Sequence, residues 1–407
     1  MSDKCLKSDL LEAFSAALRA VDPVAVTSRA VSEWDNGKPV SVIAIGKAAC
    51  GLYEGAWQAL GDQINAALVI TGREYARSVP GDPEFCFGAH PVPDQGSLDA
   101  GKRLVEFLTT SCKHNRILVL ISGGSSAMVE RLRDGVGFDD LQRVNEWLLA
   151  SGFDILQMNA IRKRLSAIKG GGLLDFLPHH DAQVMLISDV PGDDLGSIGS
   201  GLMTDDQELS TKIMALSLPS WVETLLQTGS DSPQRPAISQ QLIASNTIAL
   251  DAAEQSLLPL GLPVMRHGLL QGDAVVRGGE IGSFLLQADP GIHLWGGETT
   301  MNLPENPGRG GRNQHLALTL AKRIDGASED IRVLAASTDG IDGASQDAGA
   351  IVDTQTIENG RSLGLNANDA LVRADSNSYF DELGALVHTG ATGTNVMDLV
   401  IACKQPL

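Results

Sequence analysis

Short apolar runs recur along the chain, and each is followed by a glycine-rich polar turn. Three of them lie in the first half, at Val40–Ile45, Ile117–Ile121 and Val184–Ile187. Continuous runs of this length with β-branched residues are typical of strands that are buried on both faces of a parallel sheet. The stretches Leu98–Leu108 and Leu141–Leu149, which lie between them, have the apolar spacing of helices. This alternation predicts an α/β fold in which helices cover both faces of a parallel sheet.

A second set of runs follows a stretch rich in Ser, Pro and polar residues at Thr228–Pro236, which we predict to be a linker. The later runs are Ile292–Trp295, Val333–Ala336 and Met397–Ala402. A chain of 407 residues is too long for one ordinary core. The pattern therefore predicts two α/β domains, at residues 1–236 and 237–407.

Composition and charge narrow the class of protein. A formal charge of −19 argues against a nucleic-acid backbone or an anionic membrane as partner, and no apolar run is long enough to span a bilayer. The five cysteines are odd in number, scattered and never spaced as CxxC, which indicates reduced thiols rather than disulfides or a zinc site. We expect a cytoplasmic protein that acts on a small molecule, with no nucleic-acid or membrane partner.

Two turns in the first domain are candidate anion sites. The sequence SGGSSA, at Ser122–Ala127, follows a predicted strand, so that its N–H groups and hydroxyls could hold a phosphate or carboxylate. Lys47, in AIGKAA, is a cation near a helix start, where the helix dipole favours negative charge. The alternatives are an ordinary tight turn and a solvated lysine. No Walker A sequence occurs in the chain.

Carboxylates stand at several predicted strand ends. Asp189, in SDVPGDD, could take a proton from an attacking hydroxyl, whereas Asp193 and Asp194 follow inside a Pro-Gly turn and are weaker candidates. Helix capping and turn formation are the alternative for all three. In the second domain Glu298, Asp339 and Asp342 are candidate Mg²⁺ or ribose contacts, and the alternative is an ordinary carboxylate-rich turn.

Three further segments combine glycine with polar or basic residues. GRGGRNQ, at Gly308–Gln314, places two arginines in a flexible loop, which suits a phosphoryl group unless both are simply solvated. NAIRKRLSAIKGGG, at Asn159–Gly172, is a basic segment before a glycine cap, and TGATGTN, at Thr389–Asn395, is a hydroxyl-rich loop. His90, in HPVPD, is an isolated loop histidine, which is more often structural than catalytic.

The joint order of these motifs is more specific than any one of them: GKAA, HPVPD, SGGSSA, RKRLSAIKGG, SDVPGDD, GGETT, GRGGRNQ, STDGIDG and TGATGTN. In this order the chain resembles the class II glycerate 2-kinases across essentially its whole length. The resemblance implies a Rossmann-like N-terminal domain and a smaller C-terminal MOFRL domain that flank a closing cleft. It also implies transfer of the γ-phosphate of ATP to the 2-hydroxyl of D-glycerate, with ATP and Mg²⁺ required, and it is compatible with a homodimer.

The resemblance assigns roles to particular residues. Lys47, Asp189 and Arg312 match the family's catalytic positions, while Glu298 and Asp339 are the tentative metal ligands. The residues expected to bind substrate or nucleotide are Ser122, Gly123, Gly124, Ser125, Ser126, Asn159, Lys169, Gly310, Gly311, Asn313, Thr392 and Asn395.

Two other functions compete with the kinase. An NAD(P)H-dependent hydroxypyruvate reductase should show GxGxxG after its first strand and an acidic residue about 20 residues later. The first turn here reads GKAACG, and the next strand run ends before Gly72 and Arg73, which are not acidic. A non-catalytic ligand-binding protein would keep the cleft, but it would not need Lys47, Asp189 and Arg312.

Overall fold

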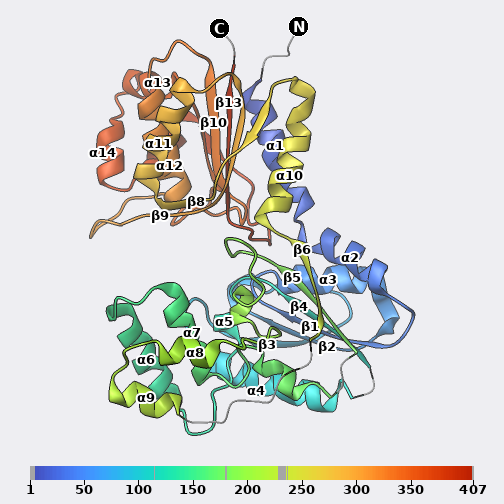
Figure 1. Cartoon of the computed structure of the whole chain (residues 1–407). Helices are drawn as coiled ribbons and strands as arrows, with labels where there is room; N and C mark the ends of the chain where they lie inside the picture. Colours follow the sequence, from blue (N-terminus) through green and yellow to red (C-terminus); the bar gives the residue numbers. More distant parts are fainter. Residues whose placement is uncertain (1–4, 114, 179–180, 228–234, 236, 406–407) are drawn as a thin grey trace. The chain divides into compact units, whose positions relative to one another are not determined.

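The computed structural model describes residues 5–113, 115–178, 181–227, 235 and 237–405 (Figure 1). The chain forms two compact units, each built around its own sheet. The N-terminal unit is Pro23–Ile243, and the C-terminal unit combines the described residues before Pro23 with those from Ala244 onward. None of the described helices combines the length and apolar composition that a membrane span requires.

The N-terminal unit contains a six-stranded sheet in the order β3-β2-β1-β4-β5-β6. Its strands are β1 (Val40–Ile45), β2 (Ile64–Thr71), β3 (Glu84–Phe87), β4 (Arg116–Ile121), β5 (Ala182–Ile187) and β6 (Ser239–Ala244). The β1–β2, β1–β4, β2–β3 and β4–β5 pairs are all parallel. The carboxyl ends of these strands therefore meet at one edge, where open α/β sheets bind ligands.

Helices cover both faces of this sheet, as the apolar pattern predicts. The helices of the unit are α2 (Pro23–Trp34), α3 (Ala49–Leu60), η1 (Gly61–Gln63), η2 (Arg73–Tyr75), α4 (Gln95–Thr110), α5 (Ser125–Met128), α6 (Phe138–Ala150), α7 (Ile155–Leu165), η3 (Gly172–Phe176), η4 (Ile198–Ser200), α8 (Leu209–Met214) and α9 (Ser220–Leu226). Helix α4 begins at the N-cap Asp94, whose carboxylate accepts from Ser97 N–H. Its apolar face packs with Ile43 and Ile45 of β1.

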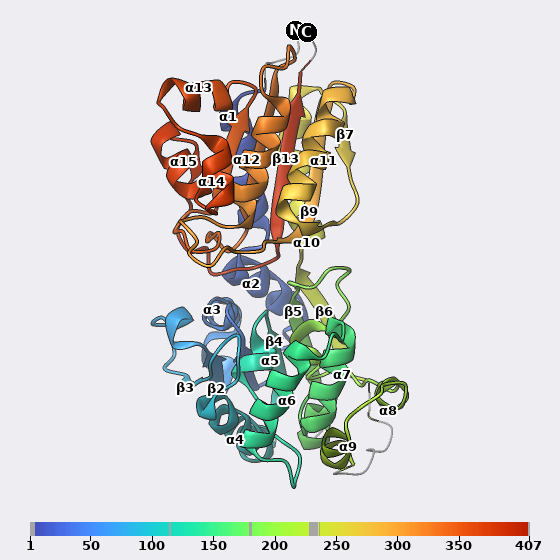
Figure 2. The same ribbon diagram turned by 90° about the vertical axis from the view of Figure 1, so that its left-hand side faces the viewer.

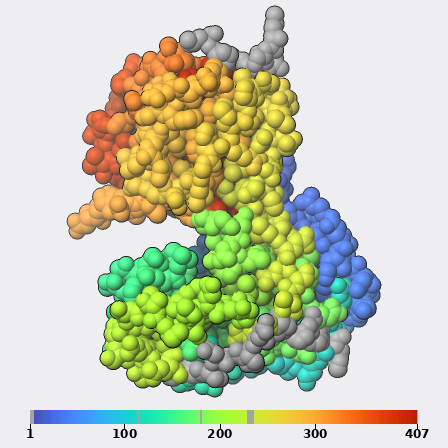
Figure 3. All heavy atoms as spheres, viewed as in Figure 1, coloured from blue at the N-terminus to red at the C-terminus, as the bar shows by residue number. Residues whose placement is uncertain are grey.

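A separate helical cluster lies beside the sheet of the N-terminal unit. Leu141 and Leu148 of α6, Leu165 of α7 and Val222 of α9 share one buried apolar core. Atoms of the segment that contains α8 and α9 form part of the surface of this unit (Figure 3). The basic segment that includes Lys169 leads out of α7 and therefore begins at this cluster.

The C-terminal unit has a mixed sheet in the order β12-β11-β10-β13-β9-β7, with β8 also paired to β9. Its strands are β7 (Val264–Arg266), β8 (Leu270–Asp273), β9 (Gly291–Thr300), β10 (Ile331–Ser337), β11 (Gly349–Asp353), β12 (Leu386–Val387) and β13 (Asp398–Lys404). Strand β13 is antiparallel to both β10 and β9, whereas β7 and β8 run parallel to β9. This domain is thus α/β in composition but is not a second parallel sheet.

Three layers make up the C-terminal unit, with α1 and α10 on one face of the sheet and α11 and α12 on the other (Figures 1 and 2). Its helices are α1 (Lys7–Ala20), α10 (Asn246–Leu257), η5 (Leu258–Leu260), α11 (Ala274–Gln287), α12 (Arg312–Ile324), α13 (Thr356–Ser362), α14 (Ala367–Val372) and α15 (Ser376–Leu383). Leu316 and Leu320 of α12 join Val333 and Val400 of the sheet in one buried core.

The domain boundaries need a correction at both ends of the N-terminal domain. Residues 1–22 were assigned to that domain, but α1 buries Leu10 and Phe14 in the C-terminal unit, where it packs on α10 and the sheet. The predicted linker Thr228–Pro236 lies outside the described residues, apart from Arg235. Because β6 still belongs to the N-terminal sheet, the chain crosses between the units after Ile243 rather than at residue 236.

Candidate active site

Neighbouring parallel strands bring two of the predicted anion-binding turns together. Strand β1 pairs with β4, so Lys47 lies next to the Ser122–Ser126 turn. Lys47 N–H donates to Gly123 O at 2.9 Å, and Ala48 N–H donates to Ser122 Oγ at 3.1 Å. The lysine stands just before α3, which begins at Ala49.

Asp189 joins the same turn from the next strand, β5. A Cβ atom built on Gly123 would lie 2.0 Å from Asp189 Oδ2, so only glycine lets the carboxylate approach this closely. Burial raises the pKa of Asp189, and the nearby Lys47 charge partly opposes that rise. We call Lys47, Ser122–Ser126 and Asp189 the N-terminal site.

This site presents donors that nothing in the described part of the chain satisfies. Lys47 is half-buried and makes no ion pair there, although its Nζ lies 5.9 Å from the centre of the Tyr75 ring. The N–H groups of Gly123 and Gly124 donate no hydrogen bond to a described residue. Ser125 Oγ is buried without a hydrogen bond, whereas Ser126 Oγ lies 2.7 Å from Ser200 Oγ. Helix α5 is one turn long, so the expected dipole of a helix opened by this loop contributes little.

His90, which the sequence favours as structural, also borders the N-terminal site. A Cβ on Gly124 would lie 3.1 Å from Lys47 Cγ and 3.2 Å from His90 Cδ2, so the lysine and the imidazole flank this glycine. Burial and the Lys47 charge lower the pKa of His90, which keeps the ring neutral near pH 7. The signal for this placement is that HPVPD follows β3, whose carboxyl end lies at the same edge of the sheet.

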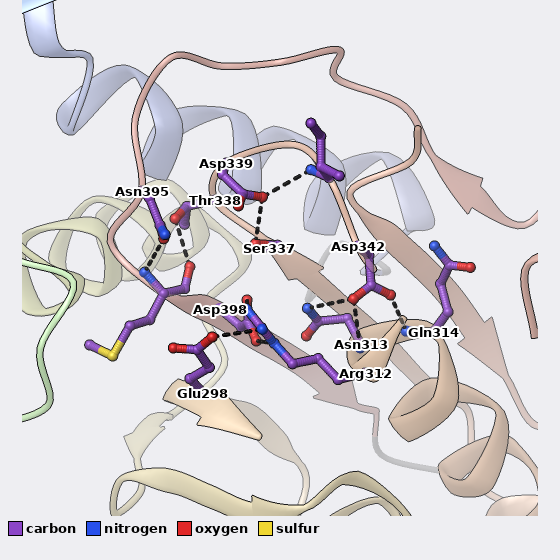
Figure 4. Close-up of polar contacts among 12 residues, drawn as sticks. Glu298, Arg312, Asn313, Gln314, Ser337, Thr338, Asp339, Asp342, Asn395 and Asp398 are labelled. Atoms are coloured by element: carbon purple, nitrogen blue, oxygen red, sulfur yellow. Dashed lines mark hydrogen bonds and ion pairs between the residues drawn. The ribbon is translucent and has the colours of Figure 1, made fainter. Parts of the chain in front are cut away.

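Arg312 is the centre of a charged group in the C-terminal unit (Figure 4). Its Nε and Nη2 donate to Asp398 at 2.7 and 3.0 Å, and its Nη1 lies 2.6 Å from Glu298 Oε1. Burial alone would lower the pKa of Arg312, but the bond to Asp398 and the surrounding carboxylates raise it. Asp398 is fully buried, whereas the Glu298 side chain is 44% exposed.

A second buried carboxylate, Asp342, occupies the N-terminus of α12. It accepts from Asn313 N–H at 3.0 Å and from Gln314 N–H at 2.8 Å (Figure 4). A Cβ on Gly311 would lie 2.4 Å from Asp342 Cγ. Burial raises the pKa of Asp342 to about 7, although these two N–H groups oppose the rise. Asn313 and Gly311 are both predicted to contact a ligand. In the structure Asn313 donates to the Asp342 carboxylate, and Gly311 leaves room for it. We call Arg312, Glu298, Asp342 and Asp398 the C-terminal charge network.

Loops around this network are tied to one another by side chains from the predicted set. Asp339 Oδ1 accepts from Ser337 Oγ at 2.8 Å and from Ile341 N–H at 2.9 Å. Thr392 Oγ1 donates to Thr338 O at 2.7 Å. Asn395 Oδ1 accepts from Met397 N–H at 2.9 Å. Gly310 has φ 145° and would clash with Ser376 if it carried a Cβ. Thr392 and Asn395, which are predicted to bind a ligand, thus form hydrogen bonds that hold the loops of this unit in place.

Two predicted binding residues, Asn159 and Lys169, make internal contacts within the N-terminal unit. Lys169 Nζ is 2.5 Å from Glu130 Oε2, with both side chains almost fully buried, and Ser166 Oγ donates to the other oxygen of Glu130. Asn159 Oδ1 accepts from Arg162 Nη1 at 3.5 Å. In the structure Lys169 is thus committed to an internal carboxylate.

Glu298 and Asp339 offer the oxygen donors that Mg²⁺ prefers. The described residues contain no group of three His, Cys, Asp or Glu side chains placed to hold a metal ion. Mg²⁺ is nevertheless usually bound by one or two carboxylates together with substrate phosphates. The donor set therefore fits an ion that arrives with a nucleotide.

Comparisons with known proteins agree across nearly the whole chain. A family model described as a domain of unknown function (DUF4147) matches residues 9–221, and the MOFRL family model matches residues 291–398. A protein of Agrobacterium vitis, named provisionally as a hydroxypyruvate reductase, is 33% identical over 98% of this chain and 94% of its own length. The D-glycerate 2-kinase of Thermotoga maritima is 31% identical over 97% of this chain and 98% of its own length.

A solved structure extends this likeness to the fold. The crystal structure of glycerate kinase from Thermotoga maritima superposes with a TM-score of 0.87 at 28% identity. It covers 98% of this chain, and this chain covers 99% of it. The fold of both units is therefore shared with that protein.

Proposed function

The chain belongs to the glycerate 2-kinase family and matches both the DUF4147 and the MOFRL family models, so we propose that it transfers the γ-phosphate of ATP to the 2-hydroxyl of D-glycerate. The products are 2-phosphoglycerate and ADP. The observation that carries this proposal is the N-terminal site. There a lysine that makes no ion pair with the described residues lies beside a strand-end aspartate, together with two N–H groups that donate no hydrogen bond to those residues.

The N-terminal site supplies the two things that phosphoryl transfer needs most, which are positioning and neutralisation of charge. Lys47 and the N–H groups of Gly123 and Gly124 bind an anionic group of the substrate. Asp189 accepts the proton of the attacking hydroxyl, and its raised pKa makes it a stronger base than an ordinary aspartate.

Arg312 contributes a guanidinium to a phosphoryl group, since its planar fork matches two oxygens better than a point charge does. Glu298 or Asp339 would be the protein ligand of a Mg²⁺ ion, which would supply neutralisation of phosphate charge. The Mg²⁺ ion, a homodimer and a cytoplasmic location all stay predictions.

Local geometry at the first turn favours the kinase over the reductase. In a dinucleotide-binding fold the N–H groups after the first strand face the pyrophosphate. Here Lys47 N–H and Ala48 N–H are both taken by the Ser122–Gly123 segment. This turn therefore lacks both the glycine fingerprint and the free N–H groups of a nicotinamide site.

A parallel assay of the purified protein tests the proposal. One arm supplies MgATP with D-glycerate, L-glycerate, glycolate or lactate and measures ADP release. The other arm supplies hydroxypyruvate with NADH or NADPH and follows oxidation of the cofactor. We expect ADP release that depends on D-glycerate, and no hydroxypyruvate-dependent oxidation. Oxidation in the second arm without phosphorylation in the first would establish the reductase instead.

A further inference from the structure

Asp398 is the most deeply buried partner of Arg312, and neither the motifs nor the family resemblance pointed to it. It is the first residue of β13, and its side chain is fully buried. Both of its carboxylate oxygens accept from the guanidinium, at 2.7 and 3.0 Å. We propose that Asp398 is a positioning residue that aims Arg312 at its anionic ligand.

The backbone before Asp398 is held in a conformation that sets the direction of this carboxylate. Met397 adopts a left-handed φ of 70°, which a non-glycine residue rarely does without support. Asn395 Oδ1 accepts from Met397 N–H at 2.9 Å, and Thr338 Oγ1 donates to Met397 O at 2.6 Å. The strained residue is thus fixed from both sides (Figure 4).

A second anchor comes from the opposite face of the sheet. Asn246, the first residue of α10, is buried and donates its Nδ2 to Val396 O at 2.8 Å and to Asp398 O at 3.1 Å. Gly296 on the adjacent β9 has to be glycine, because a Cβ there would lie 1.7 Å from Asn246 Oδ1. Helix α10, β9 and the β10 loop therefore converge on the backbone of one aspartate.

The two carboxylates that contact Arg312, Asp398 and Glu298, differ in exposure. This difference determines which edge of the guanidinium faces a ligand. The ion pair with Asp398 is desolvated on the acidic side, and removing one partner of such a pair is costly. The ion pair with Glu298 is exposed, and exposed pairs contribute little. Asp398 therefore occupies the Nε and Nη2 edge permanently, and the Nη1 edge is directed toward the exposed side, where an oxyanion can compete.

This inference rests on the proposed function, and a double-mutant cycle on kcat/KM for glycerate phosphorylation tests it. The variants are Asp398→Asn, Arg312→Met and the double variant. If Asp398 acts through Arg312, Asp398→Asn lowers kcat/KM by about 10–100-fold in the wild type, the usual loss when an orienting partner is removed. It then has less than about a twofold effect once Arg312 is gone. Equal losses in both backgrounds would overturn the proposal.

A control at an ion pair of the same geometry, with a carboxylate that is 37% exposed, accompanies the cycle, and thermal unfolding reports general stability. Asp175 holds Arg235 through the same Nε and Nη2 fork, at 2.8 and 2.7 Å, and belongs to neither site. Asp175→Asn should leave kcat/KM unchanged, and thermal unfolding confirms that every variant is folded at the assay temperature. If Asp175→Asn lowers kcat/KM as much as Asp398→Asn does, the effect is structural and the proposal fails.

The activity of the wild-type protein separates a failure of the proposed function from a failure of the positioning role of Asp398. If the wild-type protein does not phosphorylate glycerate, the proposed function fails, and the same cycle is measured on the affinity for ATP by calorimetry. Asp398→Asn should then weaken ATP binding only when Arg312 is present. Independent, additive losses in ATP affinity would overturn the positioning role by itself.

Discussion

The N-terminal site and the C-terminal charge network reach a ligand-ready state in opposite ways. The N-terminal site leaves Lys47 without an ion pair in the described part of the chain and leaves two glycine N–H groups unsatisfied. The C-terminal charge network pairs Arg312 with two carboxylates and fills the start of α12 with a third, Asp342. The N-terminal site therefore has donors that await an anion, whereas the charges of the C-terminal charge network are already paired within the protein.

This difference indicates how each region contributes. Unsatisfied polar groups at a sheet edge cost free energy unless water or a ligand replaces the missing partner, so the N-terminal site is suited to hold an anion tightly. A guanidinium already fixed by a buried carboxylate needs little reorganisation when charge develops near it. Lys47 should therefore dominate binding and charge neutralisation, while Arg312 supplies orientation.

The largest expected effect concerns a lysine that is already paired. Lys169→Met leaves Glu130 buried without its cation, and breaking a buried pair in this way typically costs about 3–5 kcal/mol. We expect a large drop in the free energy of unfolding, measured by urea denaturation, and near-normal kcat in whatever fraction folds. A stable variant that has lost activity would return Lys169 to the substrate-binding residues.

The same substitution at the unpaired lysine should give the opposite result. Lys47→Met removes a transition-state charge stabiliser, which lowers kcat/KM by about 10² or more, equivalent to about 3 kcal/mol. The free energy of unfolding should change little, because Lys47 makes no ion pair in the described structure. Near wild-type kinetics would show that the N-terminal site does not bind the reacting anion.

A smaller loss is expected in the C-terminal charge network. Arg312→Lys keeps the charge but cannot reproduce the two-nitrogen fork to Asp398, so kcat/KM should fall by about 10-fold, or about 1.4 kcal/mol. Steady-state kinetics with ATP and glycerate varied separately will show which substrate is affected. Unchanged kinetics would mean that Arg312 is only a structural partner of Asp398.

The smallest expected effect is a shift in the pH dependence of kcat/KM, because the charge of Lys47 influences the pKa of Asp189. Asp189 must be ionised to accept a proton, so kcat/KM falls as pH drops through its pKa. Burial raises that pKa and Lys47 lowers it, so the acid limb should lie above the ordinary aspartate range. In Lys47→Met the limb should move to still higher pH. A limb that stays in place would contradict the electrostatic effect of Lys47 on the pKa of Asp189.

Much of the fold follows from the apolar pattern of the sequence. The packing partner of α1 and the ion-pair partner of Lys169 do not. Strand β1 was predicted over its full length because a strand buried on both faces reads as a continuous apolar run. The place of α1 could not be predicted, since an amphipathic helix shows which face is buried but not against which sheet. The sequence gives no sign that Lys169 pairs with Glu130, because their contact depends on tertiary packing alone.

In the candidate site, too, some residues could be predicted from the sequence and others could not. Lys47, Gly123 and Asp189 were predicted together because they follow parallel strands, whose carboxyl ends meet at one edge. Asp398 was missed because its partner, Arg312, begins α12, and this contact between a strand start and a helix start depends on tertiary packing that no local motif reveals. The position of His90 beside Lys47 was not predicted, because a single histidine has no partner residue at a diagnostic spacing.

The position of the transferred phosphate tests the central claim most directly. Purified protein is incubated with D-glycerate and MgATP in the presence of enolase, and phosphoenolpyruvate is followed by its absorbance. If the phosphate goes to the 2-hydroxyl, phosphoenolpyruvate should appear at once, because enolase acts on 2-phosphoglycerate. If it forms only after a phosphoglycerate mutase is added, the phosphate has gone to the 3-hydroxyl, and the proposed placement of the 2-hydroxyl against Asp189 is wrong.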